Sequence, residues 1–217
     1  MPRLIDHDAR SAEISAAAMR VLERDGLAGL SVRVVSKEAG IAVASLRRAF
    51  ATQHELREHC LSLIGERAAE RVRVCKAQFQ GRELAERVLA EVLPVDEERR
   101  TELVAQMQLS VLALTDDRLK AAANGLSDGV RAVCAIAITA LADAGMLGEG
   151  RDHALEVVRL NALLDGIAMR GVLRGEFEGA SEILKPLEHH LDELSQPTSI
   201  TSGVSAGTVP RGDHPAG

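Results

Sequence analysis

The segment from Gly29 to Phe50 places two short helical patterns on either side of one glycine, Gly40. Ser31 is a suitable N-cap for the first helix, because its hydroxyl can accept a hydrogen bond from a backbone N–H of the first turn. Gly40 follows the last apolar residue of that helix, where glycine readily adopts the left-handed conformation that ends helices. Two short helices joined by such a turn are the outline of a helix-turn-helix DNA reader.

The second of these helices leaves small and basic residues on its outward face. Leu46 and Phe50 are spaced i,i+4, so we expect both to face inward. The positions that then point outward are Ala44, Ser45, Arg47 and Arg48. Small residues let a helix approach the major groove, and arginines reach phosphates or guanine edges. Short helix pairs also occur in helical proteins that bind nothing, so this geometry alone leaves a purely structural role open.

A scaffold is predicted on both sides of the helix pair. Apolar residues with the spacing of one helix face precede it, namely Ile14, Ala17, Ala18, Val21 and Leu22. Behind it, Thr52 and Glu55 form a capping box that begins a long helix. We therefore expect residues 1–52 to form a three-helix DNA-binding domain.

The rest of the chain predicts helices and no sheet, because alternating β-branched runs are absent. Helices are expected at about 53–79, 81–93, 96–114, 118–145, 151–174 and 179–194. One apolar stripe is expected on the third of these helices, formed by Leu103, Met107, Val111 and Leu114. The last two helices carry broad apolar faces. The predicted fold class is all-α, with an effector-binding and dimerisation domain over 53–195. Residues 196–217 are rich in Gly, Ser, Thr and Pro and predict a disordered tail.

Two segments resemble a known family of regulators. The order from Gly29 onward, Gly-Leu-Ser-Val-Arg-x-Val-x-x-Glu-Ala-Gly-Ile-x-x-x-Ser-Leu-Arg-x-x-Phe-x-Thr-Gln-x-Glu-Leu, resembles the N-terminal domain of the tetracycline-repressor (TetR) family. The run Leu-Pro-Val-Asp-Glu-Glu-Arg-Arg at 93–100 is similar to a run in the effector domain of its choline-regulatory, BetI-like branch. The resemblance implies a homodimeric transcriptional regulator, usually a repressor released by a small-molecule effector.

The resemblance also assigns provisional roles to individual residues. Ser45, Arg47 and Arg48, with Ala44, would contact the groove and phosphates of double-stranded DNA. Ser31, Arg33 and Thr52 would hold its backbone, and Gln53 is a further expected DNA-binding residue. A homodimer through about 151–194 would read a palindromic operator. Helices bearing Gln106, Met107 and Arg131 would surround an effector cavity. The sequence departs from the family where many members have tyrosine at Arg47, a serine cap at Ala42 and lysine at Gln53.

Asn161 and Asp165 are spaced i,i+4 on an otherwise apolar helix, and buried polar groups need partners. They could hydrogen-bond across a dimer seam, contact a ligand, or lie at the wet edge of an interface. These alternatives stay open at the level of sequence.

The charge of the chain is divided unevenly. The net charge is −6, but residues 1–60 hold nine Lys/Arg against eight Asp/Glu, and residues 61–217 hold seventeen against twenty-four. The acidic excess therefore lies outside the predicted reader, where a local basic patch sets the attraction for phosphates.

Other classes of protein find little support. The sequence shows no apolar run of membrane length and no apolar core of a signal peptide. Its three cysteines are widely spaced, as is typical of reduced thiols. We therefore expect a cytoplasmic protein. His54 and His59 are five residues apart rather than four, so they cannot share a helical metal site, and we expect no metal or cofactor. A helical interaction module that has lost DNA binding is the alternative, favoured by the acidic charge, Ala42 and Gln53. An enzyme would need a charged constellation that the sequence does not offer.

Overall fold

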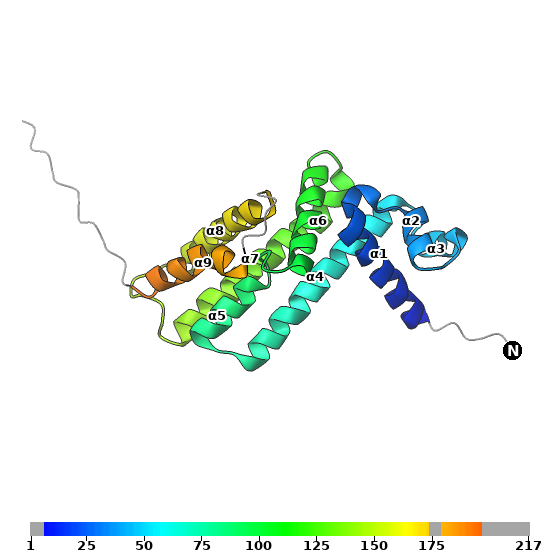
Figure 1. Ribbon diagram of the computed structural model, residues 1–217. Helices are drawn as coiled ribbons and strands as arrows, with labels where there is room; N and C mark the ends of the chain where they lie inside the picture. Colours follow the sequence, from blue (N-terminus) through cyan, green and yellow to red (C-terminus); the bar gives the residue numbers. More distant parts are fainter. Residues whose placement is uncertain (1–6, 174–178, 197–217) are drawn as a thin grey trace, which may run out of the picture.

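The computed structural model describes residues 7–173 and 179–196, and the regular elements in these ranges are helices (Figure 1). The elements are α1 (His7–Gly29), α2 (Val32–Glu38), α3 (Val43–Ala49), α4 (Gln53–Gln78), α5 (Gly81–Ala90), α6 (Glu97–Ala113), the 3₁₀ turn η1 (Asp117–Leu119), α7 (Lys120–Asp143), α8 (His153–Leu173) and α9 (Ala180–Leu194). The predicted all-α class is confirmed. The predicted tail lies, apart from Gln196, outside the described residues.

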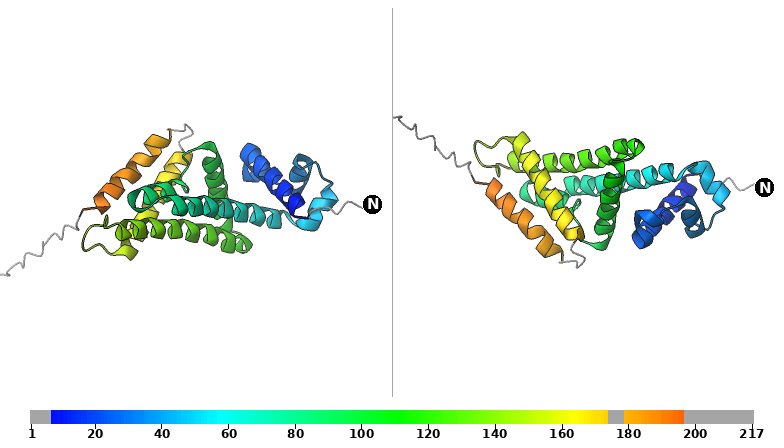
Figure 2. Two further views of the ribbon diagram at one scale, coloured as in Figure 1. Left: turned by 90° about the horizontal axis from the view of Figure 1, so that it is seen from below. Right: turned by 90° about the horizontal axis from the view of Figure 1, so that it is seen from above.

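The helices form two groups joined by α4 and α6. Helices α1 to α3 lie at one end of an elongated molecule, and α5, α8 and α9 lie at the other, with α4 running between them (Figures 1 and 2). One hydrophobic core unites α1, α2 and α3 with Leu56, Cys60, Leu61 and Ile64 of α4 and Ala105, Leu109 and Ala113 of α6. A second core surrounds α7 and takes in Val72 and Cys75 of α4. Helix α4 therefore reaches both cores as one rigid rod.

The predicted scaffold of the N-terminal group is confirmed. The five predicted inward residues of α1 are all buried, and so are Leu27 and Leu30 behind them. Gly26 has a φ of 64° and breaks α1 into a long helix and one further turn. The amide of Leu27 then donates to Oε1 of Gln108 at 3.1 Å, which ties this turn to α6.

Helix α6 buries a different face from the predicted one. Val111 and Leu114 are 65% and 78% exposed, while Glu102, Ala105 and Leu109 are buried. Leu103 and Met107 are partly buried against the second core. The predicted stripe was therefore wrong in its second half, because the end of α6 packs through its alanine and leucine face onto the N-terminal core.

Helix boundaries follow local capping chemistry. Asp96 caps α6, as predicted, by accepting from the amide of Arg99 at 2.8 Å. Helix α5 ends at Ala90, three residues before its predicted end, and the segment before Pro94 forms a tighter turn because proline disfavours helical backbone in its predecessor. Helix α8 begins at His153, where Asp152 accepts from the amides of Ala154 and Leu155 at 2.9 and 3.2 Å.

Among the residues that the structure describes, one segment, Asp117–Asp143, would be able to cross a membrane by length and composition alone. In the structure it is the turn η1 and helix α7, which contacts α4, α5, α6 and α8. Its apolar residues include Val133, Cys134 and Leu141, all buried in the second core. Of the apolar window of this segment, 28% is buried, so α7 packs into the core along one face.

Candidate DNA-binding surface and ligand cavity

The helix pair α2–α3 has the local geometry that its sequence predicts. The hydroxyl of Ser31 accepts from the amide of Val34 at 3.3 Å and caps α2. Gly40 has a φ of 64°, and the amide of Ile41 donates back to the carbonyl of Ser36 at 3.0 Å, which closes the end of α2. Leu46 is fully buried beneath α3. The turn therefore holds α3 in a fixed orientation against α1 and α2.

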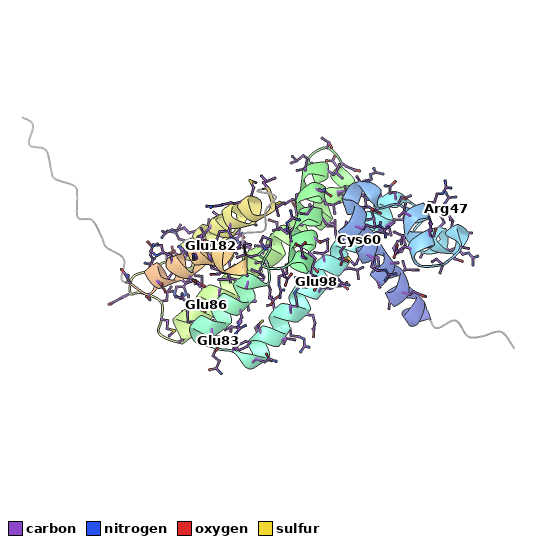
Figure 3. The ribbon with its side chains drawn as sticks, in the orientation of Figure 1. Arg47, Cys60, Glu83, Glu86, Glu98 and Glu182 are labelled. Carbon is purple, nitrogen blue, oxygen red and sulfur yellow. The ribbon has the colours of Figure 1, made fainter. Side chains whose placement is uncertain are left out.

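Helix α3 presents its other face to solvent. Ala44, Arg47 and Arg48 are exposed, as predicted, and Val43 is also 36% exposed. Ser45, which was predicted to point outward with them, is half-buried. Arg47 points away from the body at the extreme end of the molecule (Figure 3). Ala42 occupies the N-cap of α3 and makes no side-chain hydrogen bond, while the amide of Ser45 in the first turn donates to the carbonyl of Ala42 at 2.8 Å.

The cations around α3 are not neutralised by neighbouring carboxylates. Within the described chain, no ion pair involves the exposed cations of α2 and α3, which are Arg33, Lys37, Arg47 and Arg48. The one acidic residue of α2, Glu38, instead accepts from Arg20 and Arg24 of α1, each at 2.9 Å. These hydrogen bonds lower the pKa of Glu38, and the bond from Arg20 has the larger effect. The result is a locally positive surface on a negatively charged chain.

The junction into α4 adds a second anchoring point. Thr52 caps α4 by accepting from the amide of Glu55 at 3.1 Å, which confirms the predicted N-cap. The carboxylate of Glu55 reaches back to the amide of Ala51 at 2.8 Å, one residue before the cap. Gln53 is exposed, but its amide donates to the carbonyl of Leu30 at 2.9 Å. This bond, which links α4 to the turn before α2, could not be inferred from local sequence.

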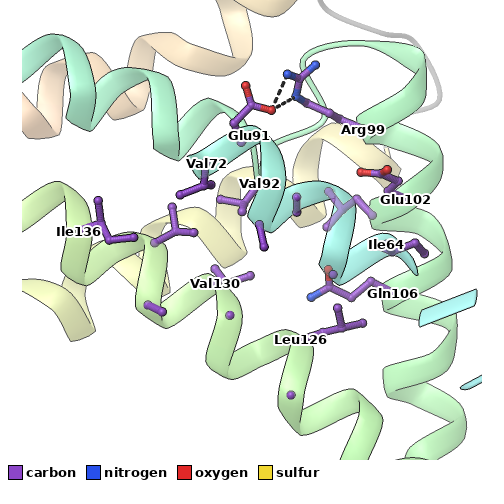
Figure 4. Close-up of a pocket in the computed structure, with 18 of the residues that line it drawn as sticks. Ile64, Val72, Glu91, Val92, Arg99, Glu102, Gln106, Leu126, Val130 and Ile136 are labelled. Carbon is purple, nitrogen blue, oxygen red and sulfur yellow. Dashed lines mark hydrogen bonds and ion pairs between the residues drawn. The ribbon is translucent and has the colours of Figure 1, made fainter. Parts of the chain in front are cut away.

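A cavity of about 570 Å³ lies between α4, α6 and α7 (Figure 4). Its walls are Ile64, Gly65, Ala68, Ala69, Val72, Arg73, Lys76, Glu91, Val92, Arg99, Glu102, Leu103, Gln106, Gly125, Leu126, Gly129, Val130, Ala132, Val133 and Ile136. Most of this lining is apolar, and its size is within the usual range for small-molecule sites.

An ionic network forms one side of the cavity. Arg71 donates to Glu91 at 2.8 Å and, with both terminal nitrogens, to Glu102 at 2.7 and 3.3 Å. Arg99 also donates to Glu91, at 3.0 Å, and pairs with Asp96. Burial alone would lower the pKa of Arg71, but the hydrogen bonds that it donates to Glu102 and Glu91 outweigh this effect and raise that pKa. The network joins α4, α5 and α6, so each acidic group at the cavity wall already has a cationic partner.

Comparison of the sequence with known protein families agrees with this geometry. The family model for bacterial regulatory proteins of the tetR family matches residues 14–60, and the C-terminal model of BetI-type transcriptional repressors matches residues 81–196. The chain belongs to the TetR family. The HTH-type transcriptional regulator PksA of Bacillus subtilis (strain 168) is 29% identical over 196 residues, 89% of this chain and 94% of PksA.

Solved structures of TetR-type regulators share the fold. A TetR transcription regulator from Haloarcula marismortui ATCC 43049 superposes with a TM-score of 0.75 at 20% identity, covering 86% of this chain and 98% of that one. A transcriptional regulator from Saccharomonospora viridis, solved in complex with choline, gives 0.73 at 20% identity, covering 85% and 96%. This chain is thus a DNA-binding transcriptional regulator of the TetR family with a C-terminal ligand-binding domain.

The cavity of this TetR-family chain includes one of the five predicted effector residues. Gln106 lines it, whereas Met107, Arg131, Asn161 and Asp165 are not among the described residues of its wall. Arg131 is exposed on α7, and Asn161 donates to Asp165 at 3.1 Å on α8, away from the cavity. The glycines of α4 and α7 were not predicted, because only the packing of two helices brings them to one wall.

The apolar faces of α8 and α9 are mostly used inside the chain. Leu160, Leu164, Ile167 and Ala168, with Ile183, Leu187 and Leu191, are buried in the second core, where the sequence had also suggested an adhesive face between chains. The large apolar residues left exposed on α8 are Leu155, Val158, Met169 and Leu173.

The described residues contain no cluster of three or more His, Cys, Asp or Glu side chains able to hold a metal ion. His54 pairs with Glu58 at 3.5 Å along α4 instead. Cys60, Cys75 and Cys134 are free and buried.

Proposed function

We propose that this chain is a homodimeric repressor that binds a palindromic operator and releases it when a small molecule enters the cavity. The observation that carries the proposal is the unpaired basic surface on α2 and α3, presented at the far end of the molecule. Arg47 and Arg48 with Ala44 and Ser45 face the major groove, and Ser31, Arg33, Thr52 and Gln53 lie beside the phosphates.

Dimerisation is supported by the exposed stripe on α8. Leu155, Val158, Ala162 and Met169 recur at three-, four- and seven-residue spacing along one side of the helix, as in a helix–helix seam. Beside them, a groove of about 470 Å³ between α8 and α9 is lined by Leu163, Gly166, Pro186 and neighbours. A second copy of the chain, docked on this face, would cover the stripe and present two readers to half-sites one helical turn apart. Asn161 and Asp165 then lie at the wet edge of the seam.

Two helices provide the switch between the cavity and the reader. Helix α4 lines the cavity through Ala68 and Val72 and enters the N-terminal core through Leu56 and Cys60. Helix α6 lines the cavity through Gln106 and holds the amide of Leu27 through Gln108. A ligand acts on DNA binding only if it prefers one placement of these helices, and that preference sets the size of the effect.

The cytoplasm, where bacterial DNA lies, is the compartment in which we propose that the chain acts. The alternative of an interaction module without DNA binding predicts that the basic surface does not bind DNA.

The test of the proposed function is a gel-shift titration of the purified chain with the promoter DNA beside its own gene, at low and moderate salt. Retarded complexes with a two-fold symmetric footprint are expected. Absence of any complex in low-salt buffer would refute the proposal and favour the alternative.

A further inference from the structure

We infer that the effector is an elongated aliphatic molecule with one hydrogen-bonding end, and not a quaternary ammonium compound. This inference rests on the proposed function, because it names the ligand class of the cavity that the switch uses. It is carried by the dimensions of the cavity, by its glycines, and by the state of its charged groups.

The cavity is long. On α7 its lining runs from Gly125 to Ile136, and on α4 from Ile64 to Lys76. At about 1.5 Å per helical residue, these stretches extend over roughly 15 to 20 Å. Between Ile64 and Ile136 the walls are mostly Ala, Val, Leu and Ile side chains (Figure 4). A chain of methylenes can lie along such a wall over its whole length.

Two exposed glycines of α7, Gly125 and Gly129, leave the solvent-facing part of this wall without side chains. A Cβ atom added at Gly125 or Gly129 would meet no atom within 4 Å, and neither residue has a positive φ. Packing and backbone geometry therefore do not require glycine at these two positions. Alanine would be the more favourable residue there, because glycine inside a helix is unfavourable. The two glycines are spaced i,i+4 and face the cavity together. What they provide is room for a ligand against bare helix backbone.

The charged groups of the wall are unsuited to a quaternary ammonium ion. Such ions are recognised by aromatic rings, and none of the described lining residues is aromatic. The carboxylates of Glu91 and Glu102 are engaged by Arg71 and Arg99, so neither is available as a counter-ion. The choline bound by the Saccharomonospora viridis structure would lack both kinds of contact here.

The polar end of the ligand is assigned to Gln106. Its side chain is half-buried at the end of the cavity near Leu126, and within the described chain it makes no hydrogen bond (Figure 4). A primary amide both donates and accepts, so it suits a hydroxyl, a carbonyl or a carboxyl group.

The inference is tested by calorimetric titration of the full-length protein with hexanoate, octanoate, decanoate and choline. The dissociation constant should fall about fourfold for each added methylene, because burying one contributes about 0.8 kcal/mol. Choline should not bind measurably. Binding is measured without DNA, and operator release is then scored separately by gel shift with the same compounds.

Variants locate the binding site. Gly129→Leu fills the cavity and should weaken decanoate binding at least about tenfold, while its melting temperature stays equal or rises because leucine is the better helix former. Ser127→Leu is the matched control, an exposed residue of α7 outside the lining, and should bind decanoate like the parent. Gln106→Leu should weaken decanoate binding but leave the fourfold increment per methylene unchanged.

The outcomes separate the two proposals. Fatty-acid binding that strengthens with chain length and is lost in Gly129→Leu supports the ligand class. If the operator complex nevertheless survives in the presence of decanoate, the ligand class stands but the proposed release of the operator is refuted. Choline binding with operator release, without decanoate binding, overturns the ligand class and leaves the proposed function standing. Binding of neither compound, or equal losses in Gly129→Leu and Ser127→Leu, also overturns the ligand class.

Discussion

At the scale of single residues, the start of α3 is a point of weakness. Ala42 has the extended backbone of an N-cap, with φ −65° and ψ 137°, but its methyl group satisfies no backbone donor. We expect Ala42→Ser to raise the free energy of unfolding by about 1 kcal/mol, because the new hydroxyl can accept from the first turn. Ser31→Ala, which removes the existing cap of α2, should lower it by a similar amount. Urea unfolding of both variants checks the pair, and equal stability of all three proteins would contradict it.

Arg48 and Arg33 are expected to make different contributions to DNA binding. If Arg48 reads a base edge, Arg48→Ala should weaken operator binding by about 1–3 kcal/mol and relax specificity at one position. Arg33→Ala removes a phosphate contact, so it should weaken all sequences about equally and reduce the slope of log affinity against log salt by about 1. Affinity measured on operator and random DNA over a salt series separates the two. Identical footprints and affinities for the parent and both variants would refute the assignment.

Burial raises the pKa of the Cys60 thiol from its ordinary value of 9.0 to about 12. In the folded protein the thiol stays protonated, while in the unfolded chain it ionises above pH 9, so the unfolded state binds fewer protons there. The stability contributed by this burial is therefore present below about pH 9 and is lost as the pH rises toward 12. We expect Cys60→Ala to show a shallower loss of stability between pH 9 and 10 than the parent, by up to about 1.4 kcal/mol per pH unit. Urea unfolding at pH 8, 9 and 10 measures it, and parallel curves would rule it out.

At the scale of helices, the network beside the cavity links three elements that are far apart in sequence. Glu102 is 5% exposed, and its carboxylate is paired with Arg71 of α4 at 2.7 Å. Arg71→Met should destabilise the protein by about 3–5 kcal/mol, because it leaves a buried carboxylate without its partner. The double variant Arg71→Met with Glu102→Leu should recover most of that loss, since a well-packed apolar pair replaces a buried ion pair at little cost. Thermal and urea unfolding compare the two, and an equally unstable double variant would show that the pair itself, not the unpaired charge, is what matters.

This network also explains how far the sequence could predict the elements. Local patterns were sufficient for Ser31, Thr52 and Asp96, since a cap depends on residues three positions apart. Local patterns did not predict the buried face of α6. Glu102 lies in that face, and a pattern of apolar residues places a glutamate on the exposed side of a helix. Its partner Arg71 is on another helix, so no local periodicity contains it. The cavity could not be predicted for the same reason, because Gly65 of α4 and Leu126 of α7 become neighbours only when the two helices pack.

At the scale of the whole molecule, the reader and the cavity are mechanically continuous. Helix α4 has no break between Thr52 and Phe79, and it belongs to both hydrophobic cores. Helix α6 supplies a second connection through Gln108. We therefore expect a displacement of either helix at the cavity to reposition the N-terminal core. In a dimer, such a displacement would change the distance between the two readers and thus their fit to a fixed spacing of half-sites.

The proposed dimer makes this argument testable. Val158 is 52% exposed in the α8 stripe, and Val111 is 65% exposed on α6, so both accept a charge without loss of core packing. Val158→Glu should give a monomer in sedimentation at micromolar concentration, because two like charges would face each other across a two-fold seam. Its operator affinity should fall by about 10²–10⁴-fold, since the second reader no longer binds at high effective concentration. Val111→Glu is the matched control and should remain dimeric with unchanged affinity. A dimeric Val158→Glu, or a monomeric Val111→Glu, would move the interface away from α8.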